Sequence, residues 1–90
     1  MNKTQMVDTL ASKTGLTKRA VSDLLSEFMD AVMDAVKKGE SVTFTGFGTF
    51  KPSKRSARTG RNPQTGETIQ IPARTVPVFR PGKAFKDLVR

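Results

Sequence analysis

The side chains of this chain that could take part in chemistry are mostly lysines and arginines. Its 90 residues include 16 Lys and Arg against 8 Asp and Glu, which gives a formal net charge of +8. Residues 1–40 hold equal numbers of basic and acidic residues, whereas residues 41–90 hold ten basic residues and only two acids, Glu67 and Asp87. A positive excess that is concentrated in one half of a chain predicts binding to a polyanion.

The residue types that most enzymatic chemistry needs are missing. The chain has no His and no Cys, so it offers neither an imidazole base nor a thiol nucleophile. Gly46-Phe47-Gly48 is too short to be a dinucleotide-binding fingerprint. We therefore predict that the protein is not an enzyme and uses no cofactor.

One row of carboxylates could hold a cation. Its members share one side of a predicted helix, because four- and three-residue spacings separate Asp23, Glu27, Asp30 and Asp34. Such a row is more often a solvated helix face, and we interpret it in that way. No metal site is predicted.

The densest charge lies in residues 51–76, which we predict to form a β-arm. The segment contains a single acid, and Ile69 and Ile71 are its main apolar residues, so it cannot form a core of its own. Residues 67–71 alternate in polarity as a strand does, and residues 59–66 have the composition of a turn. Together they predict a long two-stranded hairpin, which is mobile when free because an isolated hairpin is only marginally stable in water.

The turn sequence TGRNPQTG places a rigid apolar ring, Pro63, close to the cation of Arg61. Proline has no N–H and its ring keeps its shape, so an exposed proline could have a role beyond the turn. Asn-Pro is also a common turn pair, and Pro63 could serve the turn alone. The spacing by itself leaves both interpretations open.

Residues 1–40 predict two helices. Asn2 and Gln5 are spaced as a capping box, and Gly15 can end the first helix. Thr17 is a good N-cap for the second helix, which Lys37-Lys38-Gly39 closes with cations and a terminating glycine.

The second helix carries an apolar stripe that is long for the material available to cover it. A second copy of the same stripe is the natural cover, so we predict a homodimer. The predicted dimer core combines this stripe with aromatic residues further along the chain: Leu24, Leu25, Phe28, Met29, Val32, Val36, Phe44, Phe47, Phe50 and Phe79.

The ends of the basic half also predict regular structure. Residues 41–50 read as two strand segments with a tight turn at Gly46-Phe47-Gly48. Residues 81–90 predict a short basic helix, in which Pro81 suits the first turn.

No part of the sequence predicts a membrane location. The N-terminus, MNKTQMVDTL, lacks the apolar run of a signal peptide, and no stretch reaches the length of a membrane span. The basic arm also lacks the apolar face that insertion into a bilayer requires. We expect a soluble, cytoplasmic protein.

Four motifs resemble those of the HU family of bacterial histone-like DNA-binding proteins. They are Gly46-Phe-Gly-Thr-Phe50, Arg58-Thr-Gly-Arg-Asn-Pro-Gln-Thr-Gly66, Val76-Pro-Val-Phe79 and Gly82-Lys83. The resemblance runs from Met1 to Arg90, although Pro81 departs from the family's pattern. It implies an α+β fold in which two chains intertwine, with a helical dimerisation body (residues 1–40), a three-stranded saddle (residues 41–50 and 77–80), a protruding two-stranded β-ribbon arm (residues 51–76) and a C-terminal helix (residues 81–90).

The resemblance also implies a function. Because HU is known as an architectural binder of the minor groove, we expect this chain to bind duplex DNA with little sequence specificity, to bend and compact it, and to prefer bent, nicked or gapped DNA. Pro63 is then the wedge that intercalates. The expected DNA-binding residues are Lys51, Lys54, Arg55, Arg58, Arg61, Asn62, Pro63, Gln64, Arg74, Arg80, Lys83 and Lys86.

Two further expectations concern the partners. The second subunit is an identical chain or a paralogue, and the protein is associated with the nucleoid. A basic arm also suits the phosphates of RNA, and proteins that recognise RNA by shape need little sequence information. RNA binding, alone or beside DNA binding, is therefore the alternative function.

Overall fold

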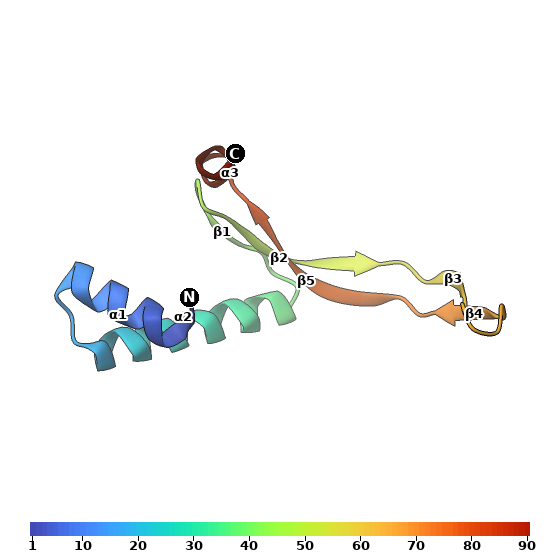
Figure 1. The fold of residues 1–90 in the computed structure, drawn as a ribbon, viewed down its shortest axis with the longest axis horizontal. Helices are drawn as coiled ribbons and strands as arrows, with labels where there is room; N and C mark the ends of the chain where they lie inside the picture. The colour runs from blue at the N-terminus through green and yellow to red at the C-terminus, as the bar shows by residue number, and fades with distance from the viewer. The chain divides into compact units, whose positions relative to one another are not determined.

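Helices and antiparallel strands make up the chain in the computed structural model, which describes residues 1–90. This mixture confirms the predicted α+β class. The chain divides into two compact units, Met1–Asp34 and Ala35–Arg90. No helix in it has the length and apolar character needed to cross a membrane. In chain order the elements are α1 (Lys3–Thr14), α2 (Lys18–Lys37), β1 (Val42–Phe44), β2 (Gly48–Arg55), β3 (Arg58–Arg61), β4 (Thr68–Ile71), β5 (Arg74–Pro81) and α3 (Lys83–Val89) (Figure 1).

The predicted capping residues close the helix ends. Asn2 Oδ1 accepts a hydrogen bond from the Gln5 N–H and Gln5 Oε1 accepts one from the Asn2 N–H, both at 2.9 Å, which completes a capping box on α1. Gly15 ends α1 in the left-handed conformation, with φ at 75°. Thr17 Oγ1 caps α2 by accepting a hydrogen bond from the Ala20 N–H at 3.1 Å.

The hydrophobic core of the single chain is very small. Its buried residues are Val7, Ala11 and Val21, which lie where α1 and the beginning of α2 run side by side (Figure 1). Leu10 and Leu25 pack against them and are only partly buried. A core of this size cannot account for all the apolar residues that the chain carries.

The apolar stripe of α2 continues beyond this core and remains uncovered. Leu24 is 66% exposed, Phe28 40% and Met29 38%. Every position predicted for the dimer core is exposed or only half-buried in the single chain. Full burial of one such side chain contributes about 1.5–3 kcal/mol, so the single chain forgoes most of the stabilisation that its stripe offers.

α2 ends where Gly39 reverses the backbone. The φ of Gly39 is 91°, its N–H donates to the Val36 carbonyl at 3.0 Å, and the Glu40 N–H donates to the Ala35 carbonyl at 2.9 Å. These two hydrogen bonds form a Schellman motif, which satisfies carbonyls at the end of the helix. The chain then enters the sheet.

β1, β2 and β5 form an antiparallel sheet in that order. The turn between β1 and β2 is closed by a hydrogen bond from the Phe47 N–H to the Phe44 carbonyl at 2.9 Å, and Gly46 takes the positive φ, 85°, that a type II turn requires. β1 pairs only with residues 48–50 of β2. The predicted three-stranded saddle is therefore present, and beyond residue 50 it becomes a two-stranded ribbon.

α3 is attached to the sheet through the turn between β1 and β2. The Gly82 N–H donates to the Phe47 carbonyl at 2.8 Å, and the Phe85 N–H donates to the Gly46 carbonyl at 3.1 Å. The rings of Phe47 and Phe85 stack, with centroids 5.6 Å apart and planes inclined by 7°. A Cβ on Gly82 would lie 2.9 Å from the carbonyl group of Gly46, so only glycine allows this approach.

The last helix starts later than the sequence predicts. Pro81 is the final residue of β5, where it pairs with Gly48, and α3 begins at Lys83. Gly82 keeps an extended backbone, with φ at −76° and ψ at 168°, because it packs against the turn before the helix begins. A proline that could open a helix therefore ends a strand instead.

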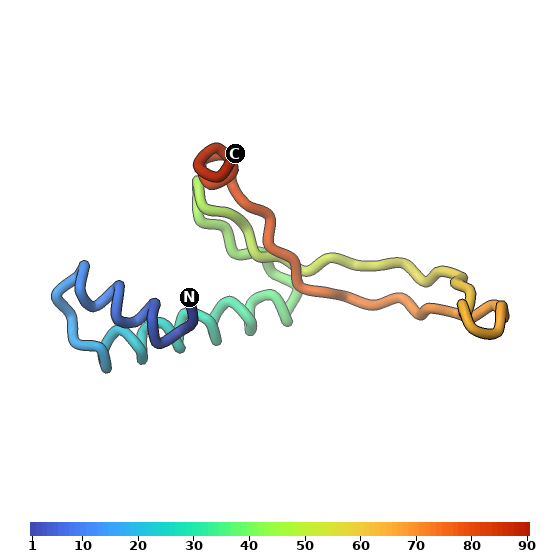
Figure 2. Tube along the Cα trace, viewed as in Figure 1, coloured from blue at the N-terminus to red at the C-terminus, as the bar shows by residue number.

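The arm is one hairpin in a single register. The ladder between β2 and β5 ends at the pair Arg55↔Arg74, and the ladder between β3 and β4 begins at Arg58↔Ile71 without any shift. The two strands run together from the sheet to the tip (Figure 2). The strands are interrupted between the two ladders, at residues 56–57 and 72–73. These four residues form the joint of the arm.

The turn at the tip is shorter than predicted. The sequence predicts a turn over residues 59–66, but residues 59–61 belong to β3 and the turn spans residues 62–67. The glycine that suggested a turn has a packing role, because a Cβ on Gly60 would lie 3.0 Å from Ile71 Cδ1 and 3.5 Å from Ile69 Cγ1.

The prolines of the arm fit a ribbon that has two edges, as predicted. Pro52 and Pro77 are direct partners across β2 and β5. Neither proline has a backbone N–H, so both fit a position of the ladder at which the N–H makes no hydrogen bond to the partner strand. Pro72 lies in the joint, where the ladder is interrupted.

Candidate nucleic-acid interface

The register of the sheet sorts its side chains onto two faces, because successive residues of a strand point to opposite sides. Phe50 and Phe79 are partners on one side, and their ring centroids lie 4.7 Å apart. Thr43 and Thr49 are partners on the other side, and their Oγ1 atoms lie 3.1 Å apart. These contacts fix the two sides of the sheet.

The two faces differ in chemistry. The first, named the apolar face, carries Val42, Phe44, Phe50, Pro52, Pro77 and Phe79. The opposite side, named the basic face, carries Thr43, Thr49, Lys51, Ser53, Arg55, Arg74, Val76, Val78 and Arg80. Aromatic and proline rings are thus separated from most of the charge by the thickness of the sheet.

The basic face offers cations that no carboxylate neutralises. It contains no acidic residue, and none of its cations forms an ion pair within the chain. Arg55, Arg74 and Arg80 are exposed, and Lys51 is half-buried. Guanidinium and ammonium groups in this condition can donate charge-assisted hydrogen bonds to phosphate oxygens. Further out, Arg61 is exposed in β3, where it pairs with Thr68.

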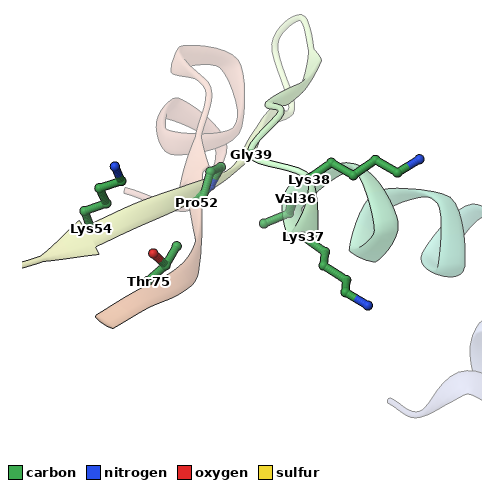
Figure 3. Close-up of a pocket in the computed structure, with 7 residues that line it drawn as sticks. All are labelled: Val36, Lys37, Lys38, Gly39, Pro52, Lys54 and Thr75. Atoms are coloured by element: carbon green, nitrogen blue, oxygen red, sulfur yellow. The ribbon is translucent and has the colours of Figure 1, made fainter. Parts of the chain in front are cut away.

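The predicted DNA-binding residues do not all share this face. Lys54 alternates to the apolar side, where it lines a shallow recess with Pro52, Thr75 and Val36 (Figure 3). Lys54 is therefore available on the side of the ribbon that is opposite to the basic face. Arg58 is exposed beyond the joint, where it pairs with Ile71.

Three lysines, Lys37, Lys38 and Lys54, line the recess. Val36 points toward the sheet, whereas Lys37 and Lys38 extend away from it (Figure 3). The recess thus lies between the end of α2 and the strands β2 and β5, and Val36 and Pro52 are the apolar side chains of its lining.

The tip of the arm presents Pro63 to solvent on a closed turn. The Asn62 N–H donates to the Glu67 carbonyl at 2.8 Å, and the Gly66 N–H donates to the Asn62 carbonyl at 2.7 Å. Asn62 Oδ1 accepts a hydrogen bond from the Gln64 N–H at 2.9 Å, an Asx-type contact that fixes the residue before the proline. Pro63 and Gln64 are exposed, and Asn62 is half-buried.

Lys83 and Lys86 form a separate basic site. Both are exposed on α3, which lies at the end of the sheet away from the arm tip (Figure 1). The structure therefore does not bring them together with the cations of the arm. All twelve predicted residues lie in the unit Ala35–Arg90.

The sequence prediction omitted three hydroxyl groups of the basic face. Thr43, Thr49 and Ser53 stand beside its cations and can donate hydrogen bonds to phosphate oxygens. Alternation along residues 49–55 carries the signal for two of them, because every second residue there is a hydroxyl or a cation.

Comparison of the sequence with known proteins gives a match over its whole length. A family model described as bacterial DNA-binding protein matches residues 1–90. The chain is 46% identical over 90 residues to DNA-binding protein HU of Geobacillus stearothermophilus and 52% identical over 90 residues to DNA-binding protein HU-alpha of Vibrio proteolyticus. Both alignments cover 100% of this chain and 100% of the relative.

Solved structures of similar chains have the same fold. An Anabaena HU–DNA cocrystal structure matches with a TM-score of 0.91 and 43% identity, covering 99% of this chain and 97% of that chain. HU from Thermotoga maritima matches with a TM-score of 0.72 and 31% identity, covering 100% of both chains.

The two faces yield a prediction that compares two lysines of the same strand. Lys51→Ala removes a cation from the basic face, so it weakens duplex binding and lowers the slope of log affinity against log salt by about 0.9 per arm. Lys54→Ala removes the same charge from the other side and lowers the slope by less. Fluorescence anisotropy titrations of a labelled duplex at several salt concentrations measure both values. Equal reductions of the salt slope in the two variants would show that both faces of the sheet contribute equally to duplex binding.

Proposed function

Because the chain belongs to the HU family of bacterial DNA-binding proteins, we propose that it binds duplex DNA through the minor groove with little sequence specificity and bends it. The observation that carries this proposal is the basic face, where cations without ion pairs stand beside hydroxyl groups on an exposed ribbon that leads to Pro63. The solved HU–DNA cocrystal structure supports it, since its chain has this fold at a TM-score of 0.91.

Low sequence specificity follows from the chemistry of the arm. Its cations suit phosphates, which are the same for every sequence. The minor groove distinguishes little more than A·T from G·C pairs. A ribbon with few side-chain amides therefore binds duplexes of many sequences, and Asn62 and Gln64 are its only amide side chains at the tip.

Pro63 is suited to act as a wedge. Its ring is exposed at the outer end of the arm, and the turn bonds of Asn62 hold the residue before it. A rigid apolar ring without an N–H can enter a base step without leaving a buried donor unsatisfied. Kinking costs a few kcal/mol per step, a value known for minor-groove architectural binders that include HU itself, and the bent duplex recovers it by meeting more protein surface.

A second copy of the chain is the proposed cover for the apolar surfaces. The stripe of α2 and the apolar face both lack burial in the single chain, with Leu24 at 66% exposure and Phe44 at 38%. A dimer buries both and brings two arms to one DNA molecule, hence two kinks. A paralogue with the same surfaces could replace the second copy. Binding to chromosomal DNA would bring the protein to the nucleoid of the cytoplasm.

The wedge predicts a selective loss of bending. Pro63→Ala should lose most of the bend on an intact duplex and part of the affinity, while the salt slope stays nearly unchanged because the charge is unchanged. On a nicked duplex the loss should be smaller, because the break already supplies flexibility. Energy transfer between dyes at the two duplex ends measures the bend.

Gln64→Ala is the matched control, since Gln64 is the exposed neighbour of Pro63 and lacks a rigid ring. It should bend the duplex as the parent protein does. If Pro63→Ala bends intact DNA as strongly as the parent, the proline serves only the turn. If duplex RNA competes as well as duplex DNA in the same titrations, the RNA alternative replaces the minor-groove proposal.

The proposed dimer predicts that one buried charge abolishes assembly. Phe28→Asp places a carboxylate in the shared core, which costs several kcal/mol, so the dimer and the fold should be lost together. Glu27→Ala, at the adjacent exposed position, should leave both intact. Sedimentation and circular dichroism at low micromolar concentration measure assembly and fold. A well-folded parent monomer in that range would contradict the dimer.

A further inference from the structure

Arg55 and Arg74 are the only charged residues that face each other across the ladders of the arm. They are direct partners and form the last pair between β2 and β5. Both are exposed and lie on the basic face. Side chains that are directly opposite in an antiparallel pair have Cβ atoms about 5 Å apart, and two like charges in this position destabilise the ribbon.

No acidic group offsets this repulsion. Glu67 is the only acid between residues 51 and 76, and it lies at the tip turn, where its carbonyl accepts from the Asn62 N–H. Neither arginine forms an ion pair. Their neighbours on the same face toward the sheet are Ser53 and Val76, which are short and uncharged. The two guanidinium groups are therefore open to the same side of the ribbon.

The pair also stands at the weakest place of the arm. Immediately beyond it comes the joint, where residues 56–57 and 72–73 leave the ladder and Pro72 has no N–H to donate. The ladder resumes in the same register at Arg58↔Ile71, so the strands stay aligned across the joint. A repulsive pair beside missing hydrogen bonds weakens the free arm, and nothing within the chain compensates for it.

An anion that binds both arginines would remove this conflict. A phosphodiester group has two oxygens that can each accept hydrogen bonds, and a guanidinium group donates two parallel ones. One phosphate between two guanidinium groups satisfies both cations and replaces their repulsion with attraction. The short neighbours leave the approach to the face free.

We propose that Arg55 and Arg74 form a phosphate clamp, in which both bind one phosphodiester group of the duplex and thereby order the joint. The clamp rests on the proposed function, because its ligand is the DNA backbone. The same two charges then have opposite effects in the two states. Their repulsion destabilises the ribbon of the free arm, and their shared phosphate stabilises it in the complex. The outer ribbon, β3 and β4, can then adjust before binding and becomes fixed when the clamp closes.

Salt dependence tests whether the two arginines share one phosphate. The slope of log affinity against log salt falls by about 0.9 for each phosphate that the protein no longer neutralises. A shared phosphate predicts that the double variant, Arg55→Gln with Arg74→Gln, lowers the slope by about 0.9 per arm, whereas separate phosphates predict about 1.8. The single variants should each lower it by less than about 0.9 per arm, because one arginine still holds the phosphate.

Hydrogen exchange tests the effect on the joint independently of affinity. In the free protein, Arg74→Gln removes the repulsion, so the amides of the ladder pairs on either side of the joint should exchange about twofold to fivefold more slowly than in the parent. On adding duplex DNA, the gain in protection should be larger in the parent than in the variant. A residue with a merely structural role would not change the free and bound states in opposite directions.

Arg61→Gln is the matched control, since Arg61 is an exposed arginine of the same arm and its partner is the uncharged Thr68. It should lower the salt slope without slowing exchange at the joint of the free protein. If the parent binds duplex DNA but the double variant lowers the slope by about 1.8 per arm, or if Arg74→Gln exchanges as fast as the parent when free, the clamp is overturned and the proposed function stands. If the parent itself does not bind duplex DNA, both fail.

Discussion

Antiparallel pairing in one register, from Gly48↔Pro81 at the base to Arg61↔Thr68 near the tip, decides where the side chains of the sheet and arm lie. Because side chains alternate along a strand, a slip of one residue would place Arg80 or Val78 opposite Phe50 and mix the two faces. The separation of apolar from basic chemistry therefore depends on the register. The turn hydrogen bonds at the two ends of the ribbon, and the paired prolines within it, are compatible with this register.

The two faces of the sheet serve two different kinds of contact in a chain of only 90 residues. Only three of its hydrophobic residues are buried, and the proposed dimer would use the apolar surface to enlarge this small core. It also needs a surface whose cations are free of internal carboxylates, because internal ion pairs would compete with phosphates. Placing these surfaces on opposite sides of a thin sheet lets both be used together. The arm has no core of its own, and in the proposed phosphate clamp its joint becomes ordered when DNA binds.

Local signals in the sequence predict much of this structure, and contacts between distant residues account for the rest. Caps at Asn2 and Thr17 and the alternation of the arm depend on neighbours in the chain, and the structure confirms them. The later start of α3 depends on the packing of Gly82 against the turn at Gly46, which lies far away in the sequence. The position of Lys54 opposite to the basic face depends on which side of the sheet the phenylalanines occupy, and strand pairing decides that. The role of Pro63 as a wedge stays a prediction, because an exposed turn proline satisfies both interpretations.

Protection of single cysteines by DNA tests the division of the sheet into two working faces most directly. The chain contains no cysteine, so one thiol can be introduced at a time. Ser53→Cys lies on the basic face, and Thr75→Cys lies one pair further along the same ladder on the apolar side. If DNA binds the basic face, duplex DNA strongly slows thiol labelling at position 53 and changes labelling at position 75 little. Protection at position 75 that equals or exceeds protection at position 53 would contradict binding at the basic face.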